Sequence, residues 1–410
     1  MVCPYSLSIP GGVQGQVLGL AKALRERGHF VQVVAPSDGP PPDAGVIVVG
    51  TSILNASNGS MAPISPDPGA QLRTIRALWD EPFDVLHLHE PLVPGPTVTA
   101  LLMRTAPIVA TFHAAGDQPG YKSMSALARR FASRISAKVA VSPDAMALAR
   151  SAIPDPWTVL FNGVDVSEFS SATPWVDPPR SGPGADADAS PDASPDASPD
   201  ASPDASPDAR TVVDSRQTLL FVGRHEERKG LQVFLSAMSL IPGNLRIWVA
   251  GSGPQTDELK RQFAGDPRIE WLGRISNEER NARMAAATVF CAPSLGGESF
   301  GVILLEAMAA RTAVVASDIS GYVGVAGPLG AEPAAALLPP AGDSVALAAA
   351  LSSLLQDPDL RGRLVEAGWK RANRFSMAQL AEAYLVIYEA VISEAKMTAE
   401  TDRFGRQVLA

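Results

Sequence analysis

Short apolar runs alternate with helical patterns along most of the chain. Five runs precede residue 145: FVQVVA (30–35), VIVV (46–49), DVLHLH (84–89), PIVATFH (107–113) and KVAVS (138–142). Four more follow residue 215: TLLFVG (218–223), LRIWVAG (245–251), TVFCAP (288–293) and AVVAS (313–317). Runs that are continuously apolar predict parallel strands covered by helices on both faces. Two such sets predict an α/β protein with two doubly wound, Rossmann-like domains.

Between the two sets of apolar runs lies a segment that cannot form a core. Residues 189–208 read ASPDASPDASPDASPDASPD, which is five copies of one tetrapeptide. Proline at every fourth position, together with Asp, Ser and Ala, favours extended and solvated chain. We interpret the repeat as an expansion tolerated within an inter-domain linker. A regulatory or docking role for it has no support beyond its accessibility.

These features divide the chain into five parts. We expect an N-terminal Rossmann-like domain over 1–164, a linker with the repeat insert over 165–216, and a C-terminal Rossmann-like domain over 217–376. A C-terminal helix over 377–396 is expected to pack back on the N-terminal domain, followed by a tail over 397–410. The opening letters MVCPYS read as the end of a strand, so the first strand is either short or begins upstream.

Composition and charge exclude several classes of protein. The 410 residues are 46% hydrophobic, enough for two packed domains. The net charge is −9, but residues 181–209 contain seven Asp and no Lys or Arg, so the remainder is nearly neutral, unlike a nucleic-acid-binding protein. Cys3 and Cys291 lie in apolar segments, which is typical of reduced thiols in a cytoplasmic protein. With neither a secretory signal nor about 18 consecutive apolar residues, we expect no membrane span.

The N-terminal half contains three segments with candidate chemistry. PGGVQ (10–14) places a Gly-Gly turn before an amphipathic helix, which indicates either an anion site at the helix N-terminus or an ordinary turn. His113 ends an apolar run, a position where histidine is more often structural than catalytic. HLHEP (87–91) places His87 and His89 on one strand face, as in some metal sites. The rest of the sequence has no matching cluster of ligands, so a zinc site is disfavoured.

In the C-terminal half, two segments follow predicted strands directly. GRHEERKG (223–230) carries Arg224, Arg228 and Lys229 at the carboxyl end of a strand, where open α/β sheets bind ligands. Clustered cations there suit a diphosphate, although a solvated charged loop is the alternative. VAGSGP (249–254) is a weaker signal, because it lacks the GxGxxG pattern of dinucleotide-binding turns.

The stretch GGESFGVILLE (296–306) contains two glutamates among glycine and apolar residues. Glu298 is predicted to lie in a loop at a helix N-terminus, and Glu306 on that helix about 12 Å further along by helical rise. This separation is too long for the carboxylate pair of a glycosidase acting on one bond, but it suits two ends of an extended ligand. The alternative is one capping glutamate and one solvated glutamate, which the apolar surroundings disfavour.

Taken together, these motifs resemble those of the retaining glycosyltransferases of family 4, which have the GT-B fold of two Rossmann-like domains facing a central cleft. The family signature is a glutamate, seven residues and a second glutamate, here Glu298 and Glu306. GRHEERKG, VAGSGP, SPDA (142–145) and NGVD (162–165) also stand at the motif positions of the family. The resemblance covers nearly the whole chain except the ASPD repeats and the last dozen residues. Within the family it is strongest to enzymes that mannosylate phosphatidylinositol.

The resemblance implies roles for individual residues. The catalytic set would be His113 beside the transferred sugar, Arg224 and Lys229 on the donor diphosphate, and Glu298 on sugar hydroxyls. Glu306 would bind the ribose, among donor-binding residues that comprise Gly12, Arg228, Gly251, Gly253, Ile275, Asn277, Gly297, Ser299, Phe300, Gly301 and Glu306. The acceptor would contact Gln14, Asn58, Ser60 and Lys122. The family is thought to need no metal or other cofactor, because Arg and Lys neutralise the leaving diphosphate.

The implied partners are a nucleotide-sugar, most simply GDP-mannose, and an inositol-containing lipid such as phosphatidylinositol. QLRTIRALW (71–79) retains Arg73 and Arg76 where related enzymes have a densely basic helix, so contact with anionic membrane would be weak and peripheral, at the cytoplasmic face. Asn277 replaces an acidic residue near the guanine, and an amide matches the guanine N–H groups less well. Another nucleotide-sugar with a soluble or different lipid acceptor is therefore the alternative. A relative that binds or epimerises a nucleotide-sugar without transferring it is a further one.

Overall fold

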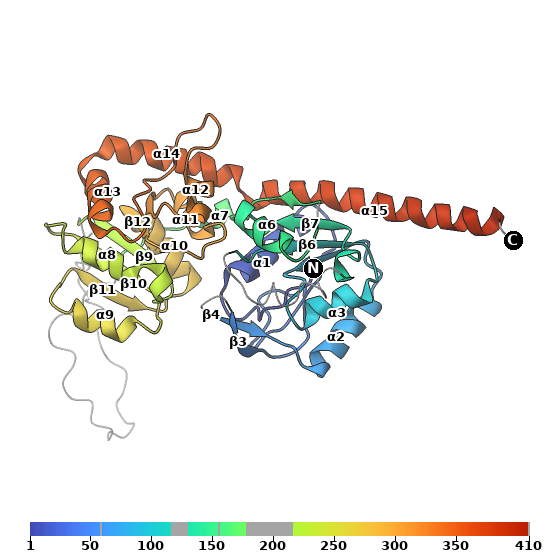
Figure 1. Cartoon of the computed structure of the whole chain (residues 1–410). Coiled ribbons are helices and arrows are strands. Elements are labelled where there is room, and N and C mark those ends of the chain that lie inside the picture. Colours follow the sequence, from blue (N-terminus) through green and yellow to red (C-terminus); the bar gives the residue numbers. More distant parts are fainter. Residues whose placement is uncertain (58–59, 116–129, 155, 178–215, 409–410) are drawn as a thin grey trace, which may run out of the picture.

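The computed structural model describes residues 1–57, 60–115, 130–154, 156–177 and 216–408. Two parallel-sheet domains lie side by side, and a long C-terminal helix runs from one along the other (Figure 1). Each of the nine apolar runs contains a strand, so the prediction of two doubly wound domains is confirmed.

The N-terminal domain is built on a parallel sheet. Its elements are α1 (Gly12–Arg25), β1 (Val33–Ala35), β2 (Val46–Val48), β3 (Ile53–Ser57), β4 (Ser60–Ile64), α2 (Pro68–Trp79), β5 (Leu86–His89), α3 (Pro96–Met103), β6 (Ile108–Phe112), β7 (Ala137–Ala140), α6 (Pro143–Arg150) and β8 (Thr158–Val159). Strands β5-β6-β7-β8 pair in that order, and β1 pairs with β2. Val2 joins the two groups through parallel bridges to Val34 and Leu88. The antiparallel hairpin β3–β4 was not predicted.

The C-terminal domain has a five-stranded sheet in the order β11-β10-β9-β12-β13. Its elements are β9 (Thr218–Val222), η1 (Glu227–Lys229), α8 (Leu231–Met238), β10 (Arg246–Ala250), α9 (Thr256–Gln262), β11 (Ile269–Gly273), α10 (Asn277–Ala286), β12 (Val289–Ala292), α11 (Val302–Ala309), β13 (Ala313–Ala316), α12 (Ser320–Ala326), α13 (Ser344–Gln356) and α14 (Pro358–Arg374). Alternate strand residues face opposite layers, because side chains alternate along a strand. Leu219 packs in the layer of α8 and α13, whereas Leu220 packs in the layer of α10 and α11.

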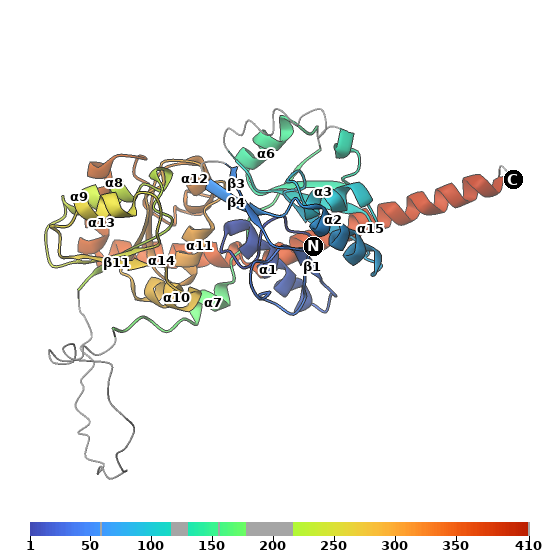
Figure 2. The same cartoon turned by 90° about the horizontal axis from the view of Figure 1, so that it is seen from below.

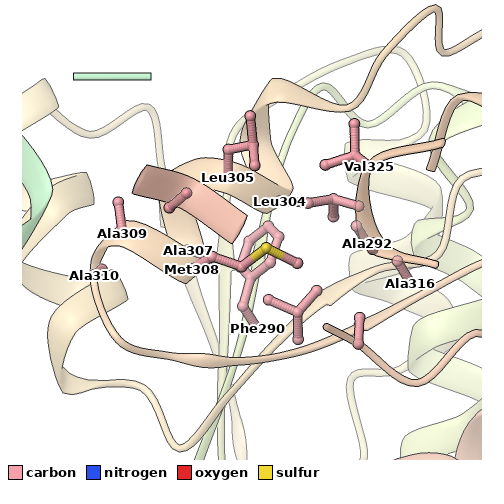
Figure 3. Close-up of a cluster of buried hydrophobic side chains, with 14 of the residues drawn as sticks. Phe290, Ala292, Leu304, Leu305, Ala307, Met308, Ala309, Ala310, Ala316 and Val325 are labelled. Atoms are coloured by element: carbon pink, nitrogen blue, oxygen red, sulfur yellow. The ribbon is translucent and has the colours of Figure 1, made fainter. Parts of the chain in front are cut away.

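Helix α11 is apolar on nearly every side and is correspondingly buried. Leu304 and Met308 lie among side chains of β12, β13 and α12, as Figure 3 shows for Phe290, Ala316 and Val325. Glu306 is the one charged residue of α11. A rigid, buried helix therefore fixes the position of this carboxylate.

The chain crosses between the domains at two places that lie side by side. Val164 donates its backbone N–H to Phe375 O and accepts from Met377 N–H, both at 2.9 Å. The Gln16 amide pairs with both backbone groups of Gly163 at 2.8 Å, which ties α1 to the same point. After this crossing, α15 (Met377–Val408) packs against α1 and β6 of the N-terminal domain (Figures 1 and 2).

Helix α15 extends through Val408, beyond residue 396 where we expected it to end. The segment 397–408, expected to be a tail, is thus helical. Once a helix is nucleated, each added residue costs little, and Met397, Ala399, Glu400 and Arg403 are good helix formers.

The connection to the repeat insert belongs to the C-terminal domain. Helix α7 (Val166–Ser170) packs on α10 and α11, and the Trp175 N–H donates to Ala282 O at 2.9 Å. Arg246 then binds Asp177 at 2.6 Å and Glu270 at 2.7 Å, and Arg216 lies 3.8 Å from the same Glu270. The segment 178–215, with the ASPD repeats, lies outside the described residues. The residues that flank it, Asp177 and Arg216, lie at the same place on the C-terminal domain.

We therefore expect the repeats to be dispensable, because their length does not set the separation of the domains. Removal of 185–208 shortens the 38-residue segment to 14 residues, and the lower entropy of loop closure stabilises the protein by at most ~0.9 kcal/mol. Melting temperature and turnover of the deletion variant should match those of the full chain. A loss of more than a few degrees in differential scanning calorimetry would show that the repeats contact the folded body.

Candidate functional site

The cations of GRHEERKG gather at the carboxyl end of β9 together with two carboxylates. Arg228 Nη1 and Lys229 Nζ both donate to Glu298 Oε1, at 3.0 Å and 2.6 Å. Glu226 lies between the two arginines, with Oε1 at 3.1 Å from Arg224 Nη1 and Oε2 at 3.2 Å from Arg228 Nε. The structure thus brings together Arg224, Arg228, Lys229 and Glu298 and adds Glu226, while their expected contacts with the donor stay predictions.

Glu298 is held ionised in a half-buried position. Burial alone would raise the pKa of its carboxyl, but the charges and hydrogen bonds of Lys229 and Arg228 outweigh it, and the pKa is lowered. The backbone is fixed as well, because a Cβ at Gly321 would lie 2.1 Å from the Glu298 carbonyl oxygen. The start of α12 therefore packs directly on this loop and holds the carboxylate in place.

The two glycines of VAGSGP are required by close packing of the backbone. Gly251 has φ +118°, and a Cβ there would lie 1.9 Å from Gly223 O. A Cβ at Gly253 would lie 2.7 Å from the backbone nitrogen of His225. Only glycine lets the turn after β10 pack against the loop that carries Arg224. Their expected contact with the donor stays a prediction.

Glu306 lies apart from the cation cluster, on α11. Its nearest cation is Arg280, with Nη1 at 3.9 Å from Oε2, too long for a hydrogen bond. Burial, with a smaller contribution from Glu168, raises the pKa of Glu306 although Arg280 opposes it. A weakly paired, half-buried carboxylate is poised to accept hydrogen bonds from ligand hydroxyls.

His113 belongs to a column of histidines at the end of β6. His89 Nδ1 lies 3.0 Å from His113 Nε2, and the His87 and His89 rings stack with centroids 4.2 Å apart. Burial lowers the pKa of all three, that of His113 to about 3, so each is neutral at physiological pH. Both nitrogens of His87 are engaged by hydroxyls, those of Tyr388 at 2.6 Å and Thr111 at 2.7 Å, which leaves no lone pair for a metal. Among the described residues no group of three potential metal ligands occurs.

Glu90 fixes the backbone beside His113. Its Oε1 accepts from the N–H groups of His113 and Ala114, both at 2.6 Å, and its own φ is +50°. A non-glycine residue with such a φ is uncommon and is maintained by surrounding contacts. This role could not be predicted from the sequence, because Glu90 and His113 are 23 residues apart.

In the Gly-Gly turn at the start of α1, the space beside Gly12 is empty and the space beside Gly11 is filled by the Gln14 side chain. A Cβ at Gly12 would have nothing within 4 Å, so this backbone can be approached by a ligand. Gln14 is buried, and its Nε2 donates to Ile9 O at 3.1 Å, so it holds the preceding loop in this arrangement. Its expected contact with the acceptor stays a prediction.

The remaining predicted residues lie on nearby loops or outside the described part. Phe300 is buried and stacks edge-on with Phe375 at 5.7 Å, so only its backbone can face a ligand. Asn277 is exposed at the first position of α10, and Ile275 precedes it. Gly297, Ser299 and Gly301 share the loop of Glu298, and Ser60 begins β4. Asn58 and Lys122 lie outside the described residues.

Comparison with protein families matches both domains. The family described as Glycosyltransferase Family 4 matches residues 10–168, and the one described as Glycosyl transferases group 1 matches residues 216–357. The two matches together cover both sheets and leave out the repeat insert.

Several relatives are similar over almost the whole chain. A phosphatidyl-myo-inositol mannosyltransferase of Mycobacterium leprae is 36% identical over 95% of this chain and 96% of its own. The protein of the same name from Mycolicibacterium smegmatis is 34% identical over 95% of this chain and 93% of its own. That from Mycobacterium tuberculosis is 33% identical over 95% and 96%.

Solved structures share the arrangement of both domains. Sucrose-phosphate synthase from Thermosynechococcus elongatus superposes with a TM-score of 0.68 at 19% identity, covering 96% of this chain and 98% of the other. HepE from Anabaena in complex with UDP and glucose gives a TM-score of 0.66 at 16% identity, covering 95% and 98%. At these identities the likeness concerns the fold alone.

The neutral histidines make the stability of the protein depend on pH. A histidine whose pKa is lower in the folded than in the unfolded chain binds its proton only on unfolding, so stability is lost as pH falls below about 6.5. Each buried histidine adds up to about 1.4 kcal/mol per pH unit to that slope. In urea unfolding between pH 7.5 and 5, His89→Asn should show a slope shallower by about this amount. Equal slopes for wild type and His89→Asn would contradict the neutral His89–His113 pair.

Proposed function

The chain belongs to glycosyltransferase family 4, and on that premise we propose that it transfers mannose from GDP-mannose to phosphatidylinositol with retention of configuration. It is a glycosyltransferase with the GT-B fold. The structural observation that carries the proposal is the cluster of Arg224, Arg228 and Lys229 around Glu298 at the carboxyl end of β9. The names of the relatives supply the sugar and the acceptor.

On the donor side, the cluster supplies charge where it is needed. Breaking the bond between sugar and diphosphate leaves negative charge on the departing phosphate oxygens. Lys229, which is half-buried, and Arg224, which is exposed at the edge of the cluster, stabilise that charge from positions set by their ion pairs. We propose that this neutralisation replaces a metal ion, and that Glu298 and Glu306 bind hydroxyls of the sugar and of the ribose.

On the N-terminal side, His113 would face the transferred sugar as a neutral ring. Its Nε2 is engaged by His89, so the other ring nitrogen, Nδ1, is the atom for a sugar hydroxyl. The open backbone of Gly12 would approach the diphosphate, and Gln14, Asn58, Ser60 and Lys122 would surround the inositol. Opposed residues from two domains suit a reaction in which closure excludes water from the activated sugar.

The lipid acceptor requires contact with a membrane, and α2 offers a surface for it. Leu72 and Trp79 are 66% and 76% exposed and lie seven residues apart, on one face of the helix with Arg76 between them. Arg76 Nε lies 3.2 Å from Asp80, and Arg73 lies 4.0 Å from Asp67, so part of the basic charge is already balanced. No helix among the described residues is both long and apolar enough to cross a bilayer. We propose a cytoplasmic enzyme that touches the membrane peripherally, through apolar side chains more than through charge.

Asn277 leaves open a nucleotide-sugar donor with a base other than guanine. It is exposed at the N-terminus of α10, where an acidic side chain would accept from both guanine N–H groups. A donor with another base, and with it another acceptor, is the second candidate function.

Release of nucleotide from GDP-mannose, with and without phosphatidylinositol vesicles, tests the proposal. We expect the lipid to stimulate release. Glu298→Gln and Lys229→Ala should lower turnover at least about 100-fold, because Lys229 neutralises the leaving group and Glu298 holds that lysine and the sugar hydroxyls, with melting temperatures of the ligand-free protein nearly unchanged. Lys370→Ala, at an exposed position of α14, is the matched control.

Three results would contradict parts of this proposal. Stimulation by another acceptor but not by phosphatidylinositol would exclude the lipid. Turnover of a different nucleotide-sugar in preference to GDP-mannose would exclude the donor. Large losses of stability in both site variants would indicate that the ion pairs serve the fold alone.

Co-sedimentation with vesicles that contain phosphatidylinositol tests the membrane contact. Leu72→Ser and Trp79→Ser should each weaken binding about tenfold, because a buried apolar side chain of this size contributes about 1.5–3 kcal/mol and these are two-thirds exposed. Arg76→Gln should weaken it less than fivefold, because Asp80 already balances its charge. Val345→Ser, at an exposed apolar position of the other domain, is the control. A larger effect of Arg76→Gln than of Trp79→Ser would show that charge drives docking.

A further inference from the structure

Glu226 occupies a position that none of the expected roles explains. Its side chain is 15% exposed, and its two oxygens approach two different arginines, Arg224 at 3.1 Å and Arg228 at 3.2 Å. These arginines are the ones expected to meet the donor diphosphate. A carboxylate between them occupies the place of an anion.

The contact with Arg228 is an ion pair without a directed hydrogen bond. Glu226 Oε2 and Arg228 Nε are both buried, and neither has a hydrogen-bond partner. By contrast, Glu298 accepts well-formed hydrogen bonds from Arg228 and Lys229. Burying an unsatisfied polar group costs free energy, so an oxygen that satisfied the Arg228 N–H would be favoured there.

The charges of these five side chains are nearly balanced. Arg224, Arg228 and Lys229 carry three positive charges, whereas Glu226 and Glu298 carry two negative ones. Without Glu226, the cluster would hold two net positive charges. Glu226 therefore halves the net charge that attracts an anionic ligand.

We propose that Glu226 is a built-in competitor for the diphosphate, which occupies Arg224 and Arg228 in the ligand-free enzyme and promotes release of the nucleoside diphosphate product. The inference rests on the proposed function, since it takes the ligand to be a nucleotide-sugar. Glu226 acts through the two arginines and is a positioning residue, not a catalytic one.

The competition would fall more heavily on the product than on the donor. A nucleoside diphosphate carries about three negative charges near neutral pH, but the diester diphosphate of a nucleotide-sugar carries two, because its terminal phosphate is esterified. Coulomb repulsion from Glu226 scales with the charge of the ligand. Removal of the Glu226 charge should consequently tighten binding of GDP more than binding of GDP-mannose.

Glu226→Gln tests the inference, with Glu227→Gln as the matched control. Glu227 is the next residue, is exposed, and loses the same charge on substitution. We expect Glu226→Gln to lower the Ki of GDP about 30-fold and the KM of GDP-mannose about tenfold, in the ratio of the ligand charges. Turnover should fall as product release becomes slow, whereas Glu227→Gln should shift each constant less than threefold. If the role of Glu226 were purely structural, its substitution would change the Ki of GDP and the KM of GDP-mannose by the same factor.

Each outcome decides the matter. Weaker GDP binding by Glu226→Gln would mean that Glu226 orients the arginines for the ligand, and equal tightening by both variants would mean a general effect of net charge; either overturns the inference. If wild type binds neither GDP nor GDP-mannose in calorimetry, the proposed function fails instead. If Glu226→Gln lowers the melting temperature of the ligand-free protein, Glu226→Asp replaces it. That variant keeps the charge but cannot bridge both arginines, so its GDP Ki should fall about threefold, and an unchanged Ki would also overturn the inference.

Discussion

The donor half of this protein depends on a small number of charges held at the carboxyl ends of parallel strands. Glu298 ties the loop after β12 to η1 through Arg228 and Lys229, and the backbone of the same loops is linked where Leu295 N–H donates to Arg228 O at 2.8 Å. These ion pairs are partly exposed, so they add little to global stability, but they set the position of each side chain. The ion pairs that would meet the diphosphate thus also hold the empty site in shape. Chemistry and local folding use the same contacts.

The sequence predicted what is local and periodic. Continuous apolar runs are enough to locate strands, and the position of Arg224 directly after such a run places it at the ligand-binding edge of the sheet. The spacing of Glu298 and Glu306 placed one in a loop and the other on a helix, as the structure shows. Contacts between distant segments gave no such signal. Tyr384 and Tyr388 reach Thr111 and His87 across more than 270 residues, and the pairing of His89 with His113 depends on the register of β5 and β6.

The same motif can either bind a ligand or pack inside the fold, and the sequence alone does not distinguish the two. Gly251 and Gly253 stand where a ligand could approach, yet their lack of a Cβ is already required by the loop that carries Arg224. Phe300 lies in a motif expected to bind the donor, but its ring fills the core beside Phe375. A glycine or an aromatic residue in a motif indicates close packing, and only the fold shows against what. Glu226 is the converse case, because an acidic residue in a basic loop looks like solvated charge until its two arginines are located.

The two halves of the site are coupled through a narrow connection. Both crossings of the chain pair with each other at Val164 and Phe375, and Gln16 joins Gly163 to α1, the helix whose first turn includes Gly12. Beyond this point α15 continues under the N-terminal sheet, where Tyr384 and Tyr388 bind the strands that end at His89 and His113. The crossing is tightly packed, because a Cβ at Gly163 would lie 2.8 Å from Met377 Sδ. A side chain at Gly163 would therefore disturb both the helix that begins at Gly12 and the helix that supports the histidine column, since Gln16 and Met377 both meet Gly163 there.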